Sequence, residues 1–235
     1  MLDRYLSREN RRDQNRSPDD KKIYSRKFDL HQYFSPASRN TKKFIYYDKL
    51  KGISMIHDAT TISGDPKTLV VAVQGACPHD GSDLATESSL GIFFGEDSSF
   101  NLCDRIERPG GELHTSDFAE LMAVFRALEL INESSFFETW RADAENGPAF
   151  TVIIMTDSIY VYECLTVLIW QWRQNNFKDL DAMGKPVVNG ELIDRIDKNI
   201  FDLAERNICV RFWSVPSEDN VEAVELANRA LIPGC

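Results

Sequence analysis

One acidic residue lies at a position where catalytic side chains are common. Asp157 follows an apolar, β-branched run at residues 150–155 and precedes a segment with apolar residues at helical spacing from Ile159 onward. The pattern predicts a buried central strand that leads directly into a helix. Ligands of open α/β sheets bind at the carboxyl ends of the strands, which makes Asp157 a candidate catalytic carboxylate. The alternative is a helix cap, because an Asp before a helix satisfies free backbone amides.

Side chains that commonly bind zinc or form disulfides show no such grouping. The five cysteines have no CxxC spacing, and their odd number argues against a disulfide framework. We therefore expect reduced thiols and an intracellular protein, cytoplasmic or nuclear. The four histidines are too scattered to indicate a metal site: His31, His57, His79 and His114.

The charge of the chain is unevenly distributed. Residues 1–51 carry 14 Lys and Arg against 7 Asp and Glu, whereas residues 52–235 carry 13 against 30. The acidic body argues against broad, charge-driven binding of nucleic acid, because phosphate contacts supply most of that affinity. A nucleic-acid contact would need a local patch or the basic segment. No apolar run approaches the roughly 20 residues of a membrane span, so we expect no membrane association.

These differences predict three parts of the chain. They are a basic, partly disordered N-terminal extension at residues 1–51, a linker at 52–66 and one folded domain at 67–235. Aromatic residues alternate with Lys and Arg between residues 28 and 47. Such a segment can stack bases or pack its rings on the domain. It can also bind a protein partner, or dock on the acidic body of its own chain.

The periodicity of the folded part predicts an α/β sheet. Three strands in a meander precede a helix, and two further strands alternate with helices. We expect a mixed five-stranded sheet, three antiparallel strands and then two parallel ones, flanked by helices. The expected strands are residues 68–77, 89–95, 100–107, 150–155 and 209–215, the expected helices begin near residues 116, 159, 189 and 220, and residues 134–148 are expected to form a polar connection.

Several motifs in this order resemble one family. LVVAVQGAC is similar to a first strand that ends Asp-Gly-Ala/Ser, TSDFAELMAVFRALE to a helix with Thr-Asn-x-x-Ala-Glu-Leu, and VIIMTDSIYV to a strand end with Thr-Asp-Ser. A tryptophan-containing segment, WQWRQNNFKDLDAMGKPVVNGEL, and a last helix, DNVEAVELA, complete the series. The chain resembles type 1 ribonuclease H, particularly that of filamentous fungi, over residues 67–231. The resemblance implies the ribonuclease H-like fold.

The resemblance also implies a chemistry, which this chain meets only in part. The family cuts the RNA strand of RNA–DNA hybrids with two Mg²⁺ or Mn²⁺ ions held by four carboxylates. By correspondence, Glu120 and Asp157 supply two of them, whereas Gln74 and Val224 occupy the other two positions. Two acids leave two divalent cations uncompensated, which predicts a catalytically inactive protein that binds nucleic acid or another protein and needs no metal.

The alternative is an active or weakened Mg²⁺- or Mn²⁺-dependent nuclease. Asp80 and Asp83 lie in the loop after the first strand, and either acid could replace a missing ligand.

The resemblance places further residues at the nucleic acid. The positions that match the family's backbone contacts are Thr115, Ser116, Trp172, Arg173, Lys178, Lys185 and Asn189. At one such position the family's Asn-Gln reads Ser-Asp, which puts the acid Asp117 close to the expected path of the RNA. For Trp172, packing on an amphipathic helix is an equal alternative.

Overall fold

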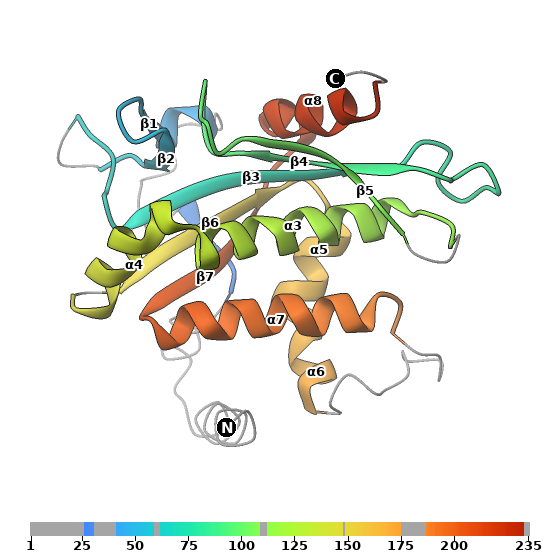
Figure 1. Cartoon of the computed structure of the whole chain (residues 1–235). Coiled ribbons are helices and arrows are strands. Elements are labelled where there is room, and N and C mark those ends of the chain that lie inside the picture. Colours follow the sequence, from blue (N-terminus) through green and yellow to red (C-terminus); the bar gives the residue numbers. More distant parts are fainter. Residues whose placement is uncertain are drawn as a thin grey trace.

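The computed structural model describes residues 26–30, 41–58, 62–108, 112–147, 149–174 and 187–232. At its centre lies β3 (Thr68–Ala76), which pairs with β4 (Ser88–Phe93) in antiparallel and with β6 (Phe150–Thr156) in parallel orientation (Figure 1). β5 (Leu102–Ile106) extends the sheet beyond β4, and β7 (Ile208–Ser214) runs parallel to β6. The expected mixed α/β sheet, antiparallel on one side and parallel on the other, is confirmed.

Two strands precede those that the sequence predicts. β1 (Ile45–Asp48) and β2 (Ile53–Ile56) form an antiparallel hairpin, and β2 joins the sheet where Ser54 pairs with Val70. The sheet therefore has seven strands among the described residues, and the expected count of five was too low. The hairpin lies within the ranges expected as extension and linker, and a domain boundary at residue 67 stays a prediction.

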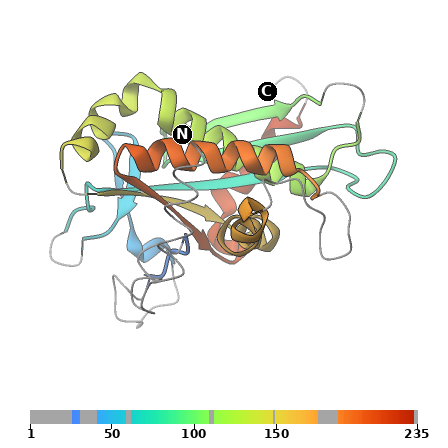
Figure 2. The ribbon, with the colours of Figure 1, turned by 90° about the horizontal axis from the view of Figure 1, so that it is seen from below.

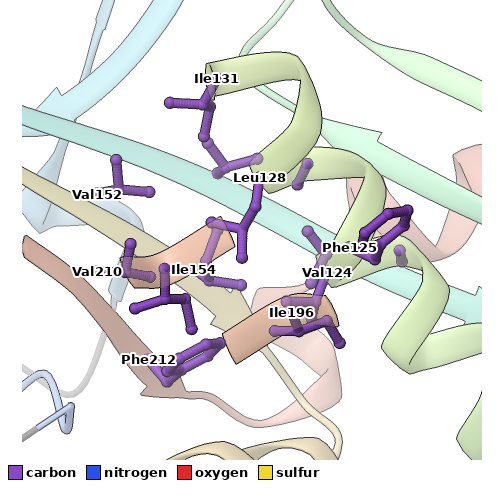
Figure 3. Packing of buried hydrophobic residues seen from close by; sticks show 14 of the residues in the cluster. Val124, Phe125, Leu128, Ile131, Val152, Ile154, Ile196, Val210 and Phe212 are labelled. Atoms are coloured by element: carbon purple, nitrogen blue, oxygen red, sulfur yellow. The ribbon is translucent and has the colours of Figure 1, made fainter. Parts of the chain in front are cut away.

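One face of the sheet is covered by three helices. α3 (Ser116–Glu133) and α7 (Gly190–Glu205) cross it, and α4 (Glu138–Glu145) packs near the start of β6 (Figures 1 and 2). Figure 3 shows how side chains of α3, α7, β6 and β7 interdigitate in the main core. α4 replaces part of the polar connection expected at 134–148 and follows a short 3-10 turn, Ser135–Phe137. It escaped prediction because its sequence, ETWRADAE, has no apolar stripe.

The opposite face of the sheet is covered less completely. α8 (Val221–Ala230) packs on β4, β3 and β5 and follows a 3-10 turn, Ser217–Asp219. A second, smaller core lies on this face and includes Val70, Ala72 and Met155. Thr41–Phe44 forms a further 3-10 turn before β1. Figure 1 shows the β1–β2 hairpin and α8 on the same side of the sheet.

The helix expected after β6 is interrupted. α5 (Ile159–Glu163) passes through a π-helical turn, Cys164–Leu168, into α6 (Ile169–Gln174). Lys178 and Lys185, both expected to contact nucleic acid, lie outside the described residues. No helix among the described residues is long and apolar enough to cross a membrane.

Residues 26–28 add a short parallel bridge to the free edge of β7. The amide of Phe28 donates to the carbonyl of Phe212 at 2.8 Å, and the amide of Phe212 donates to the carbonyl of Arg26 at 2.7 Å. The Phe28 ring packs on Trp213 with centroids 5.2 Å apart. Part of the basic N-terminal segment thus packs on the domain, because its backbone and aromatic ring satisfy the edge strand.

Candidate active site

The parallel pairing of β3 and β6 brings two of the candidate residues to one end of the sheet. Ala72 pairs with Met155, and Gln74 and Asp157 follow these residues by two positions on neighbouring chains. Asn220, which precedes α8, lies between them and is fully buried. Its side-chain amide lies 2.8 Å from Asp157 Oδ1, 3.1 Å from the carbonyl of Val73 and 3.5 Å from Gln74 Oε1. The two strand ends and α8 are therefore held together by one buried amide.

Glu120 reaches the same site from α3. The helix can approach β3 so closely because position 75 is glycine: a Cβ there would lie 2.2 Å from the backbone carbon of Ala119 and from the nitrogen of Glu120. Ser158, which follows Asp157, donates a hydrogen bond of 2.5 Å to Glu120 Oε2. The same hydroxyl accepts from the amide of Val161 and so caps α5. The cap that the sequence suggests for Asp157 is thus supplied by its neighbour.

The electrostatics of Glu120 reflect an acidic and partly buried site. Burial raises the pKa of Glu120 to about 7; the Ser158 hydroxyl opposes this shift, and the charges of Asp117, Asp157 and Asp80 add to it. Asp117 behaves similarly, because burial and the charge of Asp80 raise its pKa. No cationic side chain contributes to either shift. The site is rich in negative charge that its own protein groups do not neutralise.

The fourth position of the site carries an apolar side chain. Val224 lies on α8 one turn after Asn220, and its amide donates to the carbonyl of Asn220 at 3.1 Å. Here too a glycine sets the distance between helix and sheet, because a Cβ at Gly91 would lie 2.2 Å from the carbonyl oxygen of Ala223. The helix is placed as a ligand-bearing helix would be, but the half-buried side chain of Val224 offers no oxygen.

The two loop acids differ in their relation to the site. Asp80 and Asp83 are both exposed. The charge of Asp80 raises the pKa of Glu120, Asp117 and Cys77, in each case in addition to burial, so Asp80 faces the site electrostatically. No comparable effect of Asp83 is found among the described residues. Asp80 is thus the better placed of the two candidate substitutes.

These donors do not fit two divalent cations. Mg²⁺ and Mn²⁺ require hard anionic oxygens, and a two-metal site places two such ions about 3.5–4 Å apart. Within the described part of the chain, no three His, Cys, Asp or Glu side chains are grouped closely enough to hold a metal ion. Gln74 adds a neutral oxygen and Val224 adds none. The site offers Glu120 and Asp157, with hydrogen bonds from Ser158 and Asn220 that already occupy one oxygen of each carboxylate.

The residues expected to contact nucleic acid have varied surroundings. The Thr115 hydroxyl caps α3 by accepting from the amide of Phe118 at 3.1 Å, and Ser116 is the first residue of that helix. Asn189 caps α7 in the left-handed conformation, with φ at 59°. Trp172 is half-buried and packs against the main core. Their roles at nucleic acid stay predictions.

Arg173 has a protein partner instead of an open position. Its guanidinium is 7% exposed and donates to both carboxylate oxygens of Asp197 on α7, at 2.7 and 2.8 Å. Arg26 donates to the same carboxylate at 2.6 Å. A buried pair of this kind holds α6 against α7, and it leaves Arg173 poorly placed to meet a phosphate.

Two residues of the site were not among the expected ones. Asn220 lies within the last quoted motif, and Ser158 directly follows Asp157, so both had a weak signal in the sequence. Their bonds to Asp157 and Glu120 join residues 63 and 38 positions apart, which periodicity does not reveal.

Comparison with known proteins agrees with this geometry. A family model described as RNase H matches residues 67–229. The ribonuclease H of Schizosaccharomyces pombe is 30% identical over 162 residues, 68% of this chain and 52% of that protein. The ribonuclease H of Roseobacter denitrificans is 36% identical over 90 residues, 38% of this chain and 49% of that protein. The matched regions span about half the length of these two relatives.

Solved structures of similar arrangement include two described proteins. A foamy viral protease-reverse transcriptase in complex with RNA/DNA hybrid is 22% identical with a TM-score of 0.49, over 68% of this chain and 19% of that one. RNase H1 from the halophilic archaeon Halobacterium salinarum NRC-1 is 18% identical with a TM-score of 0.40, over 70% and 97%. With the family model covering most of the chain, the assignment is plain: the chain belongs to the ribonuclease H family.

Proposed function

We propose that this protein binds nucleic acid, RNA–DNA hybrids in particular, without cleaving it. The observation that carries the proposal is the pair of replacements at the site, Gln74 and Val224. Both lie on elements positioned as the chemistry would need them, on β3 and on α8, but they supply no negative charge. The scaffold is thus retained while the ligand set is reduced.

The charge balance supports loss of two-metal hydrolysis. Two divalent cations carry four positive charges, and Glu120 and Asp157 offset only two of them in a partly buried site. A Glu120 with a pKa of about 7 is not even fully ionised at neutral pH. Binding of a hybrid does not require these ions in the same way, because backbone contacts and stacking can supply its affinity.

A weakened Mg²⁺- or Mn²⁺-dependent ribonuclease H is the second candidate. It is favoured by Asp80, whose charge acts on Glu120 and Asp117. If the loop after β3 moved Asp80 inward, three acids would face the site. Such an enzyme would depend on Asp80 as strongly as on Asp157.

The test is cleavage of a labelled RNA–DNA hybrid in Mg²⁺ and in Mn²⁺, with binding of the same hybrid measured in parallel. We expect the wild type to bind and not to cut, and the variant Gln74→Asp with Val224→Asp to regain cutting. Asp157→Asn, made in the restored background, is the control and abolishes that activity. If the wild type cuts, and both Asp80→Asn and Asp157→Asn stop it, the second candidate replaces the first.

A further inference from the structure

A cavity of about 180 Å³ lies on the α8 face of the sheet, outside the site described above. We name it the β1–α8 cavity. Its floor is formed by Val70, Ala72, Phe93 and Met155, and its walls include Ile45 and Tyr47 of β1. The register places these floor residues on one face: Ala72 pairs with Phe93 on one side and with Met155 on the other. The cavity is thus a part of the second core that no helix covers.

The cavity depends on a part of the chain outside the family match. Lys42, Ile45, Tyr47 and Ser54 line it, whereas the family model begins at residue 67. The wall is firmly placed, because a Cβ at Gly95 would lie 2.1 Å from Cε2 of Tyr47, so the Tyr47 ring lies directly on the Gly95 backbone. The β1–β2 hairpin therefore builds a binding feature that the family scaffold alone would not have.

The rim of the cavity is acidic. Glu96, Asp219 and Glu222 line it together with one cation, Lys42. Lys42 is paired with Glu222 at 2.5 Å, which shows that the rim binds an ammonium group. No ion pair among the described residues involves Glu96 or Asp219. A second hollow, which shares Phe93, Glu96 and Glu222 with this one, adds Asp97 and Glu225 against the single cation Arg229.

The size and charge of the cavity together indicate what it can bind. Sites for drug-sized ligands have volumes of roughly 300–1,000 Å³, so this cavity fits a smaller group, such as one aromatic or branched apolar side chain. Single apolar anchors in a pocket with a polar rim are typical of protein interfaces. An acidic rim favours Lys and Arg next to that anchor.

We propose that the β1–α8 cavity docks a basic segment of a partner protein, with one aromatic or branched apolar side chain inserted between β1 and β3. Lys and Arg beside this anchor pair with Glu96 and Asp219. The surface is separate from hybrid binding at Asp157, so the protein can hold a nucleic acid and a protein at the same time. The inference does not depend on whether the chain cleaves hybrids.

A peptide probe tests the proposal on the full-length chain. The probe is a fluorescein-labelled peptide with one phenylalanine flanked by two arginines on each side, and its controls carry alanine for phenylalanine or glutamate for arginine. The methyl group of Met155, which lines the cavity, is the reporter in an NMR titration, and the methyl group of Met122, on α3 at the other face, is the internal control. We expect the probe to shift Met155 and not Met122, and both control peptides to bind about tenfold more weakly or worse.

Variants of the chain separate docking from general attraction. Glu96→Gln with Asp219→Asn weakens the probe about tenfold, whereas Glu133→Gln, an exposed acid at the end of α3, leaves binding unchanged. Ile45→Trp fills the cavity and abolishes the Met155 response, with urea unfolding as the check that the variant is folded. The proposal is overturned if Met155 does not respond at millimolar probe or if the alanine peptide binds as well as the phenylalanine peptide. It is also overturned if a hybrid, or a second copy of the chain at high concentration, shifts Met155 where the probe does not.

Discussion

The side-chain amide of Asn220 donates a hydrogen bond of 2.8 Å to the carboxylate of Asp157, and the carbonyl of Val73 lies 3.1 Å from the same nitrogen. Asn220 is fully buried and stands at the start of α8. One amide therefore fixes the rotamer of the central acid and ties α8 to the ends of β3 and β6. This bond explains why the site keeps its geometry although two ligand positions have changed.

Replacement of Asn220 is expected to damage the fold as well as the site. Asn220→Ala leaves the Val73 carbonyl and an Asp157 oxygen without their donor, which costs about 2–3 kcal/mol of unfolding free energy in urea. Asn220→Asp keeps the shape but places a second carboxylate beside Asp157. It is expected to be destabilised more at alkaline than at acid pH, because both acids are then ionised. Unchanged stability of Asn220→Ala would refute this role for the amide.

The parts of the fold that the sequence predicts are those with long, regular patterns. β3, β6, α3 and α8 were expected within one or two residues of their ends, because apolar periodicity over seven or more residues distinguishes strand from helix. β1 and β2 have only four residues each and are stabilised by their pairing, not by their own pattern. α4 is stabilised by tertiary contacts, since the buried Arg141 donates to the carbonyls of Ile131 and Ser134.

The candidate site was predictable in position but not in its contacts. Glu120 and Asp157 were recognised from motifs, and the structure places both at the same edge, each held by a neighbouring hydroxyl or amide. Distances between elements are set by Gly75 and Gly91, where the absence of a Cβ permits close approach. A sequence shows a glycine but not which helix it faces, so the bonds of Ser158 and Asn220 could not be derived from it.

Gly75→Ala is expected to displace the helix that carries Glu120. The new Cβ would lie 2.2 Å from backbone atoms of Ala119 and Glu120, and backbone cannot move aside as a flexible side chain can. Overpacking of this kind costs about 3 kcal/mol in urea unfolding and should also weaken binding of the hybrid. Gly81→Ala is the control, because nothing lies within 4 Å of that position and only its φ of +79° opposes the change. Equal losses in the two variants would contradict close packing of α3 as the cause.

Asp197 is expected to make stability depend on pH at the acid end. Burial alone would raise its pKa, but the charges and hydrogen bonds of Arg26 and Arg173 outweigh burial and lower it. The stabilisation is therefore complete above the unfolded pKa of about 4 and is lost as pH falls through the lower folded value. Asp197→Asn leaves two buried guanidinium groups without their counterion, which costs about 3–5 kcal/mol at neutral pH.

A control for Asp197 lies on the same helix. Asp194 pairs with Lys198 at the surface of α7, with half of the lysine side chain exposed. Asp194→Asn should cost about 0.5 kcal/mol or less. We expect the difference in unfolding free energy between wild type and Asp197→Asn to shrink as pH falls below about 4, whereas the difference for Asp194→Asn stays small throughout. A difference for Asp197→Asn that is constant with pH would show that its charge is not what stabilises the fold.

Phe28→Ala tests whether residues 26–28 are an integral part of the sheet. Phe28 is 6% exposed and packs on Trp213, so the loss of its ring should cost about 3 kcal/mol in urea unfolding. The amide of Phe212, which donates to the carbonyl of Arg26, should then exchange its hydrogen faster, because the bridge at the edge of β7 opens. Leu50→Ala, at a side chain that is 99% exposed, is the control and should change neither stability nor exchange. If Phe28→Ala matched this control in both measurements, the segment would lie against β7 without stabilising it.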